Sequence, residues 1–307
     1  SLMFNGHLDV VGVEGMTHAP FDAFEREGRI YGRGGSVMKG GIAAMCAAAA
    51  RMKGSLRGDI VIAAVVDEEW QSLGTSALLA SGIRTTAAIV AEPTQLAMMP
   101  AHKGFVWIEV TTHGRAAHGS RWDIGVDAIR HAGLLLTELD RIDTDELPRR
   151  QHHLLGRASL HASTIAGGLG LSTYPDRCTL RIERRTIPGE SLDQVRSELS
   201  IACDRVRAQR PDVQMNTEVL FAQPPSDVAL AAPICQALSS ALTAHSLSIT
   251  PVGMSAWTDA ALLNEAGIPA ICFGPGDMGL AHAAEEYIPI AEVEQATGVL
   301  RTLATDW

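Results

Sequence analysis

Three apolar runs in the first hundred residues constrain the fold of this chain most strongly. They span Leu2–Val11, Asp59–Val66 and Ala87–Ala91, and the last two are rich in β-branched residues and alanine. Strands of this composition are typically covered by helices on both faces of a parallel sheet. Helical segments are expected between them, at the alanine-rich Gly41–Met52 and at Ser76–Ser81. The alternation predicts an α/β domain with a mostly parallel sheet.

The pattern changes after residue 102. Phe105–His113 alternates apolar and polar side chains, as do His161–Ile165 and Arg177–Arg185, which is typical of strands with one face in water. Apolar residues recur at helical spacing in Ile124–Ile142 and Ser191–Arg207. Strands that alternate in this way, together with two amphipathic helices, predict an α+β module.

The last third of the chain returns to helices and buried strands. Helix is expected at Val228–Ala244 and strand at Ala270–Phe273. A length of 307 residues is sufficient for two domains. We therefore expect an α/β domain made of residues 1–102 and 217–307, interrupted by an inserted module at residues 103–216.

Overall composition narrows the possible partners and compartment. The net charge of −10 and the pI of about 5.5 argue against nucleic-acid or anionic-membrane partners. The five cysteines are scattered and form no CxxC motif, so a cysteine zinc site is not expected and a reducing compartment fits best. No run is long and apolar enough to span a bilayer, and no signal peptide is recognised. These features predict a cytoplasmic protein.

Ionisable side chains follow the buried strands. His7 and Asp9 are two residues apart, so His7 could bind a metal while Asp9 holds its other ring nitrogen. Glu68 and Glu69 supply two adjacent carboxylates, one able to bind metal and one able to take a proton from water. Glu92 ends the next strand. The carboxyl ends of strands meet at one edge of an open α/β sheet, which predicts a metal site there.

Other candidate residues are ambiguous by themselves. His282, after a Gly/Pro-rich loop, and His118, in the inserted module, could be ordinary loop histidines. Arg185 ends a strand and is suited to bidentate binding of a carboxylate, although such arginines are usually only solvated. The glycine-rich segments lack the spacing of dinucleotide or phosphate loops, and no nucleophile elbow is complete. Hydride transfer, phosphoryl transfer and serine catalysis are therefore disfavoured.

Six motifs, in this order, resemble those of the M20 metallopeptidase family, which includes acetylornithine deacetylase and succinyl-diaminopimelate desuccinylase. They are Gly6-His7-Leu8-Asp9-Val10-Val11, Gly32-Arg33-Gly34 with Met38-Lys39-Gly40-Gly41, Asp67-Glu68-Glu69, Ala91-Glu92-Pro93-Thr94, Ala116-Ala117-His118-Gly119-Ser120, and Phe273-Gly274-Pro275-Gly276 ahead of Ala281-His282. The resemblance covers nearly the whole chain. It implies a zinc-peptidase-like α/β catalytic domain with an inserted α+β, ferredoxin-like lid and dimerisation domain.

The resemblance also implies a metal site and a reaction. Two zinc ions are expected, with cobalt as a possible substitute. His7 and Glu92 would hold one ion, Glu69 and His282 the other, and Glu68 would be the general base. The implied reaction is hydrolysis of an N-acyl amide or peptide bond in a carboxylate-bearing substrate, either an N-acyl amino acid or a dipeptide.

Further roles follow from the same resemblance. Asp9 would orient the first histidine. His118 would stabilise the oxyanion, reaching the site of the partner subunit in a homodimer formed through the inserted domain. Arg185 would bind the substrate carboxylate. Ser172, which stands near the position of a family asparagine, and Gly276 would make further substrate contacts.

Besides Ser172, which replaces the family asparagine, the sequence departs from the family pattern in two further ways. Val37 occupies the position of an aspartate that bridges the two metals, and valine has no metal-binding atom. We therefore expect weaker metal binding, to one ion or none, and low or no activity. The N-terminal part of the catalytic domain is also expected to be missing. Two alternatives stay open: an inactive family member that binds a carboxylate ligand or only dimerises, and a one-metal hydrolase.

Overall fold

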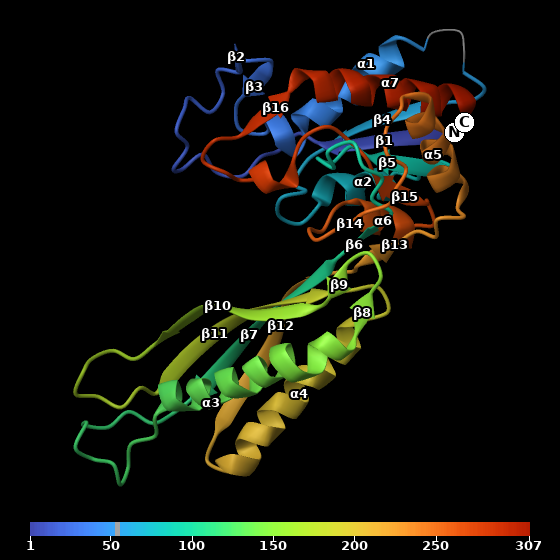
Figure 1. Cartoon of the computed structure of the whole chain (residues 1–307). Helices are drawn as coiled ribbons and strands as arrows, with labels where there is room; N and C mark the ends of the chain where they lie inside the picture. The colour runs from blue at the N-terminus through green and yellow to red at the C-terminus, as the bar shows by residue number, and fades with distance from the viewer. Residues whose placement is uncertain (53–55) are drawn as a thin grey trace. The chain divides into compact units, whose positions relative to one another are not determined.

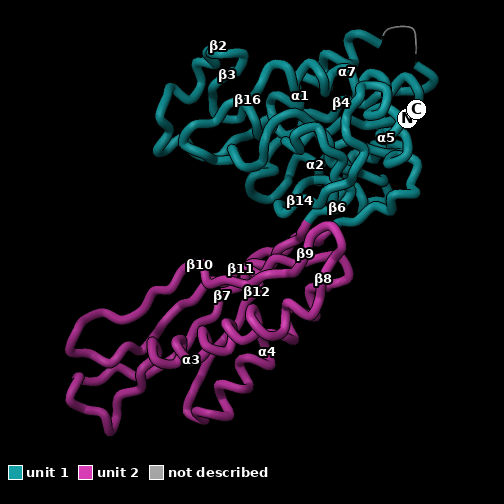
Figure 2. Tube along the Cα trace, in the orientation of Figure 1, with its two compact units in different colours: residues 1–102, 226–307 teal, residues 103–225 magenta. Residues whose placement is uncertain are grey.

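The computed structural model describes residues 1–52 and 56–307, which form two compact units (Figures 1 and 2). The first comprises residues 1–102 and 226–307, and the second residues 103–225. The predicted boundary between residues 216 and 217 is too early. It falls within strand β12 (Gln214–Gln223), which pairs with β7 (Gly104–His113) and so belongs to the sheet of the inserted unit.

A four-stranded parallel sheet forms the centre of the first unit. Its order is β15 (Ala270–Cys272), β5 (Ala87–Val90), β1 (Leu2–His7) and β4 (Ile60–Val65). Strand β1 is shorter than the predicted Leu2–Val11, because its neighbours end at Val65 and Val90 and offer no further ladder partners. The carboxyl ends of all four strands therefore lie at the same edge of the sheet.

Helices cover both faces of this sheet (Figure 1). Residues that alternate along β1 enter different cores: Leu2 and Phe4 pack with one set of helices, and Met3 packs in a second core. The helices of the first set are α1 (Gly40–Ala50), α5 (Pro233–Ala244) and α7 (Ile290–Asp306). Helices α2 (Leu73–Ala80) and α6 (Ala260–Glu265) belong to the other face. This burial on two faces explains the almost uninterrupted apolar runs of the strands.

Two small sheets complete the first unit. One joins the hairpin of β2 (Phe24–Arg26) and β3 (Arg29–Tyr31) to β16 (Tyr287–Pro289). The other contains the short strands β6 (Ala101–His102), β13 (Ser226–Asp227) and β14 (Gly253–Met254). Between β3 and α1 the chain forms the tight turn η1 (Gly35–Lys39), which contains Val37.

The second unit is an antiparallel sheet with two helices on one face. The strand order is β10 (Ser159–Gly167), β11 (Arg177–Thr186), β7 and β12, with helices α3 (Ala128–Arg141) and α4 (Leu192–Gln209) and a minor hairpin of β8 (Gln151–His152) and β9 (Gly156–Arg157). Helix α3 starts later than the predicted Ile124, because the Asp127 side chain caps it by accepting from the Arg130 N–H at 2.9 Å.

No described helix has the length and apolarity required to cross a bilayer.

Candidate metal and active site

His7 is the last residue of β1 and is almost completely buried, with 1% of its surface exposed. Its Nδ1 lies 3.1 Å from the backbone carbonyl oxygen of Asp9 and 3.4 Å from the Asp9 carboxylate. Asp9 in turn accepts from the Glu69 N–H at 3.1 Å. Burial alone would lower the pKa of His7, but the Asp9 hydrogen bond and the charges of Glu92, Asp9 and Glu69 outweigh it and raise the pKa to about 9.

A group of three potential metal ligands forms around this histidine. One donor atom from each of His7, Glu68 and Glu92 lies within 4.8 Å of the other two, the one such group of three or more in the described parts of the chain. His7 Nε2 and Glu68 Oε2 are 3.9 Å apart. Burial, reinforced by the charges of Glu92 and Asp259, raises the pKa of Glu68 well above its usual range, and burial raises that of Glu92 to about 7. Such a site favours a cation or a shared proton.

Glu69 and His282 form a separate pair. His282 Nε2 lies 3.2 Å from one Glu69 carboxylate oxygen and 3.3 Å from the other. The His282 side chain is 52% exposed, whereas the Glu69 side chain is 16% exposed. The structure thus brings all the predicted ligands to the edge of the sheet where its strands end, but divides the titratable groups into a buried group of three and a partly exposed pair.

Val37 is buried beside this edge, in a backbone turn held by a carboxylate. Glu286 accepts from the N–H groups of Ser36 at 3.0 Å and Val37 at 3.2 Å. The same carboxylate forms a buried ion pair with Arg33, whose Nη1 is 2.9 Å away. The position expected to carry a bridging ligand is therefore rigidly supported, but its side chain contributes no donor atom.

Gly276 adopts a backbone conformation that favours glycine, which the sequence analysis did not predict. Its φ of +98° favours glycine, and a Cβ there would approach the Ser36 hydroxyl to 2.6 Å. Its N–H donates to the Glu292 carboxylate at 2.8 Å. Its carbonyl accepts from the Gln95 N–H at 2.8 Å, so both backbone polar groups of Gly276 already have partners, and the predicted substrate contact is left to the space that its missing side chain provides.

The remaining predicted residues lie in the second unit. His118 Nδ1 is 2.8 Å from the Ser120 hydroxyl, and the neighbouring Gly119 N–H donates to the Ser172 carbonyl at 2.7 Å. The loops that carry His118 and Ser172 are therefore side by side. Their roles in substrate binding and catalysis stay predictions.

Arg185 occupies β11, where two neighbours orient it. Its Nε pairs with Glu183, and its guanidinium lies 5.4 Å from the centre of the Phe105 ring. The preceding residue, Arg184, is fully buried and makes ion pairs with Glu190 at 2.8 Å and Glu198 at 3.1 Å. Arg184 also donates to the Arg185 carbonyl, so a buried ionic network holds the backbone of the predicted carboxylate-binding residue.

Asp259 was missed by the sequence analysis. It is 1% exposed, and its carboxylate accepts from the Thr75 hydroxyl at 2.6 Å, which in turn accepts from the Asn5 amide at 3.2 Å. Burial raises the pKa of Asp259 to about 6. Its charge acts on both Glu68 and Glu92. The sequence signal was weak, because a single aspartate ahead of a short helix is usually only a cap.

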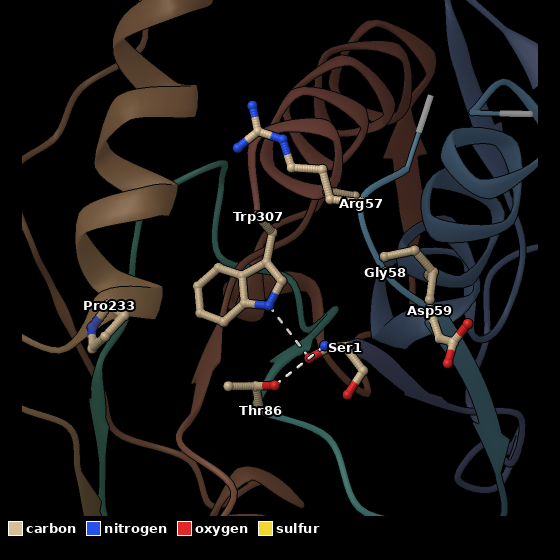
Figure 3. A pocket seen from close by; sticks show the side chains of 9 residues that line it. Ser1, Arg57, Gly58, Asp59, Thr86, Pro233 and Trp307 are labelled. Carbon is tan, nitrogen blue, oxygen red and sulfur yellow. Dashed lines mark hydrogen bonds between the residues drawn. The ribbon is translucent and has the colours of Figure 1, made fainter. Parts of the chain in front are cut away.

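A cavity of about 360 Å³ lies elsewhere, around Ser1, Thr86 and Trp307 (Figure 3). The Trp307 indole N–H donates to the Ser1 carbonyl at 3.3 Å. Asp59 and Ile60 also line the cavity, which places it at the amino ends of the strands. Ligands of open α/β sheets bind at the carboxyl ends, so this cavity is not the candidate active site.

Comparison with known sequences identifies the family. Residues 3–306 match the profile of Peptidase family M20/M25/M40, and the chain belongs to this family of hydrolases. It is 28% identical to acetylornithine deacetylase of Myxococcus xanthus over 98% of this chain and 78% of the relative. It is 26% identical to N-formyl-4-amino-5-aminomethyl-2-methylpyrimidine deformylase of Bacillus subtilis over 100% of this chain and 79% of the relative. The family resemblance inferred from the motifs is confirmed.

Solved structures show the same fold. Aminopeptidase PepT from Bacillus cereus superposes with a TM-score of 0.81 at 19% identity, covering 99% of this chain and 80% of PepT. A Bacillus subtilis protein described as a dinuclear metal-binding peptidase of the M20 family gives a TM-score of 0.74 at 15% identity, with coverage of 99% and 80%. The predicted fold class, an α/β catalytic domain with an α+β insertion, is confirmed.

Proposed function

We propose that this chain is a metal-dependent hydrolase of the acetylornithine deacetylase type, which cleaves an N-acyl amide or peptide bond beside a free carboxylate. The observation that carries the proposal is the buried group of His7, Glu68 and Glu92 at the carboxyl edge of the sheet. Membership of a hydrolase family and the deacetylase and deformylase names of its relatives support it. The substrate class is an N-acyl amino acid or a dipeptide.

The donor set is suited to a divalent cation. His7 Nε2 is buried and makes no hydrogen bond within the described residues, so a cation that displaces its proton can bind there. One imidazole and two carboxylates are common ligands of zinc, and cobalt accepts a similar set. A cation bound there would polarise the scissile carbonyl and lower the pKa of a water molecule. Two ions fit poorly, because Val37 provides no bridging atom.

The other residues have roles that follow from their chemistry. Asp9 fixes the orientation of the His7 ring through Nδ1. Arg185, held against Phe105, presents a guanidinium suited to the substrate carboxylate. His118 can donate a hydrogen bond to an oxyanion. Glu68 is the general base in a chain that has a complete metal site.

Restoring the missing carboxylate tests this proposal. The Val37→Asp variant, supplied with Zn²⁺ or Co²⁺, is assayed on a panel of N-acyl amino acids. We expect turnover to rise on the order of 100-fold or more above the unchanged chain, because the charge and the ligand atoms of the complete metal site are each worth several kcal/mol to the transition state.

Val37→Asn is the matched control, since it has nearly the same shape as Val37→Asp without the charge. It should remain close to the unchanged chain. A folded, metal-loaded Val37→Asp protein without turnover on any member of the panel would contradict the proposed activity.

A second function is favoured by the environment of Val37. Glu286, paired with Arg33, holds the turn although the Val37 side chain is apolar, so the turn is well formed without a metal bridge. A family member of this kind could bind a carboxylate ligand without cleaving it. Calorimetric titration of the chelator-treated protein with N-acetyl amino acids tests this: binding that is lost in Arg185→Ala supports it, and the absence of binding excludes it.

A further inference from the structure

We infer that this chain, with Val37 in place, holds a single divalent cation on His7, Glu68 and Glu92, and that Glu68 is a ligand rather than the base. The inference rests on the proposed function, because both place a metal ion at the same three residues. It differs in the number of ions and in the role of Glu68, and it makes no use of substrate.

The geometry of the three donor atoms permits a common ion. Atoms whose separations do not exceed 4.8 Å share a point no more than about 2.8 Å from each, compared with zinc bonds of about 2.0–2.2 Å. The 3.9 Å between His7 Nε2 and Glu68 Oε2 is close to the separation of about 3.4 Å between two ligands of a tetrahedral zinc ion. Small side-chain rotations therefore close the site.

The burial of these groups favours a bound cation. His7 and Glu92 are 1% and 2% exposed, and the Glu68 side chain is 10% exposed. Asp259, 1% exposed, adds another acid to the same region. Carboxylates buried together without a cation are costly, and the unbonded His7 Nε2 faces the same group. A cation shared by the three donors satisfies all of these requirements at once.

A second ion does not have a comparable set of ligands. Glu69 and His282 bond to each other at 3.2 Å, and in the described residues they gain no third donor close enough to form a group of three. Val37 has no donor atom. The carboxylate nearest to its backbone, Glu286, is used by Arg33 and by two N–H groups. One ion is therefore expected, whereas the Bacillus subtilis relative is described as dinuclear.

The role of Glu68 depends on the number of metal ions that the chain binds. Where His7 and Glu92 share one ion without a bridging carboxylate, Glu68 is the one remaining member of the group of three that can complete the set of ligands. A carboxylate that binds the ion is a weaker base and is held in place by the metal bond, so it is poorly suited to take a proton from water. The change of role thus explains in physical terms why the chain should lose activity together with its second ion.

Metal titration tests the inference directly. The chelator-treated full chain is titrated with Zn²⁺ by calorimetry, and with Co²⁺ by visible absorption, in the unchanged protein and in Glu68→Gln. We expect about one ion per chain. In Glu68→Gln the metal affinity should fall about 100-fold or more, which is a larger loss than is typical when a residue that does not bind the metal itself is replaced. The thermal midpoint of metal-free Glu68→Gln checks that this variant folds.

Glu69→Gln is the matched control, because it removes the adjacent carboxylate. It should keep the single ion with affinity within about 10-fold of the unchanged chain. In the Val37→Asp background, Glu68→Gln should retain its metal while losing turnover, because there Glu68 returns to the role of base.

The outcomes separate this inference from the proposed function. Two ions per chain, or a Glu68→Gln protein that binds as tightly as the unchanged chain, would overturn the inference while leaving the hydrolase proposal intact. No binding of either metal would also overturn it, and the activity of Val37→Asp would still decide the hydrolase proposal. A single ion lost with Glu68 but not with Glu69 supports the inference even where Val37→Asp is inactive.

Discussion

At the scale of single residues, the site is dominated by acids that are held away from water. Glu92 has a pKa raised to about 7 by burial, and His7 has a pKa raised to about 9 by its acidic neighbours. Both groups therefore hold protons more tightly in the folded metal-free protein than in the unfolded chain. This imbalance makes the stability of the metal-free protein depend on pH.

The metal-free protein should lose stability between pH 5 and pH 9. The contribution of Glu92 is fully present below its ordinary pKa of 4.5 and is lost as the pH rises through about 7. That of His7 is fully present below 6.5 and is lost as the pH rises through about 9. Each shift is worth on the order of 3 kcal/mol, so the thermal midpoint of chelator-treated protein should fall steadily over this range.

Two controls accompany the pH series. Glu92→Gln should flatten the part of the decline that is centred near pH 7. One equivalent of Zn²⁺ should remove the decline, because metal ligands must be deprotonated and binding strengthens as the pH rises. Asp9 does not interfere, since its lowered pKa affects stability only in more acidic solution. A thermal midpoint that rises from pH 5 to pH 9 without metal would contradict the assignment.

At the scale of elements, helix α1 presses directly against the strand end that carries Glu92. A Cβ at Gly41 would lie 2.0 Å from the Ala91 carbonyl oxygen, the residue just before Glu92. The absence of a side chain at Gly41 is therefore what lets the first turn of α1 approach the end of β5. The turn with Val37 immediately precedes this contact, so helix, turn and strand end are positioned together.

Gly41→Ala should damage both stability and metal binding. The new methyl group must displace backbone, which typically costs about 1–3 kcal/mol, and it shifts Glu92 out of the ligand group. The free energy of unfolding by denaturant and the Zn²⁺ affinity measure the two effects. Gly133→Ala is the control, since a Cβ there meets nothing within 4 Å in the middle of α3 and should be neutral or stabilise by up to about 1 kcal/mol. Equal behaviour of the two variants would refute this view of α1.

The sequence predicts some of these elements well and others poorly, for physical reasons. The parallel sheet is visible in the sequence because strands buried on two faces are apolar throughout. The hairpin Phe24–Arg26 and Arg29–Tyr31 is not, because its ladder is completed by Tyr287–Pro289 from the other end of the chain. Asp259 is missed for the same reason, since its position under the site depends on hydrogen-bonding partners from β1 and α2.

At the scale of the whole molecule, the chain builds two units with separate cores, and the inserted one has an open sheet edge. Strand β10 lies at the end of the strand order and is exposed from His161 to Gly167. It contains no charged residue and no proline, which are the usual protections of such an edge. The opposite edge strand, β12, carries Glu218 on its exposed part. The unprotected edge suits pairing with a second copy.

We expect the chain to form a homodimer in which two β10 strands pair across a twofold axis. An isologous pairing of this kind satisfies the free backbone groups of both edges and buries the apolar side chain of Ile165. Ile165→Lys places a charge at that edge and should raise the dimer dissociation constant on the order of 10–100-fold. Light scattering after size-exclusion chromatography, over a dilution series, measures it.

Ile249→Lys is the matched control for this dimer, since Ile165 and Ile249 are the same residue type and each is 51% exposed, but Ile249 belongs to the first unit. It should leave the dimer intact. Because the family resemblance implies that His118 serves the site of the partner subunit, a dimer through this edge would also make the oxyanion role of His118 dependent on assembly. In the Val37→Asp background, Ile165→Lys should then reduce turnover at low protein concentration, and turnover should recover at high concentration. If the unchanged chain is a monomer, or if the two lysine substitutions have equal effects, neither the β10 dimer nor the dependence of His118 on assembly is supported.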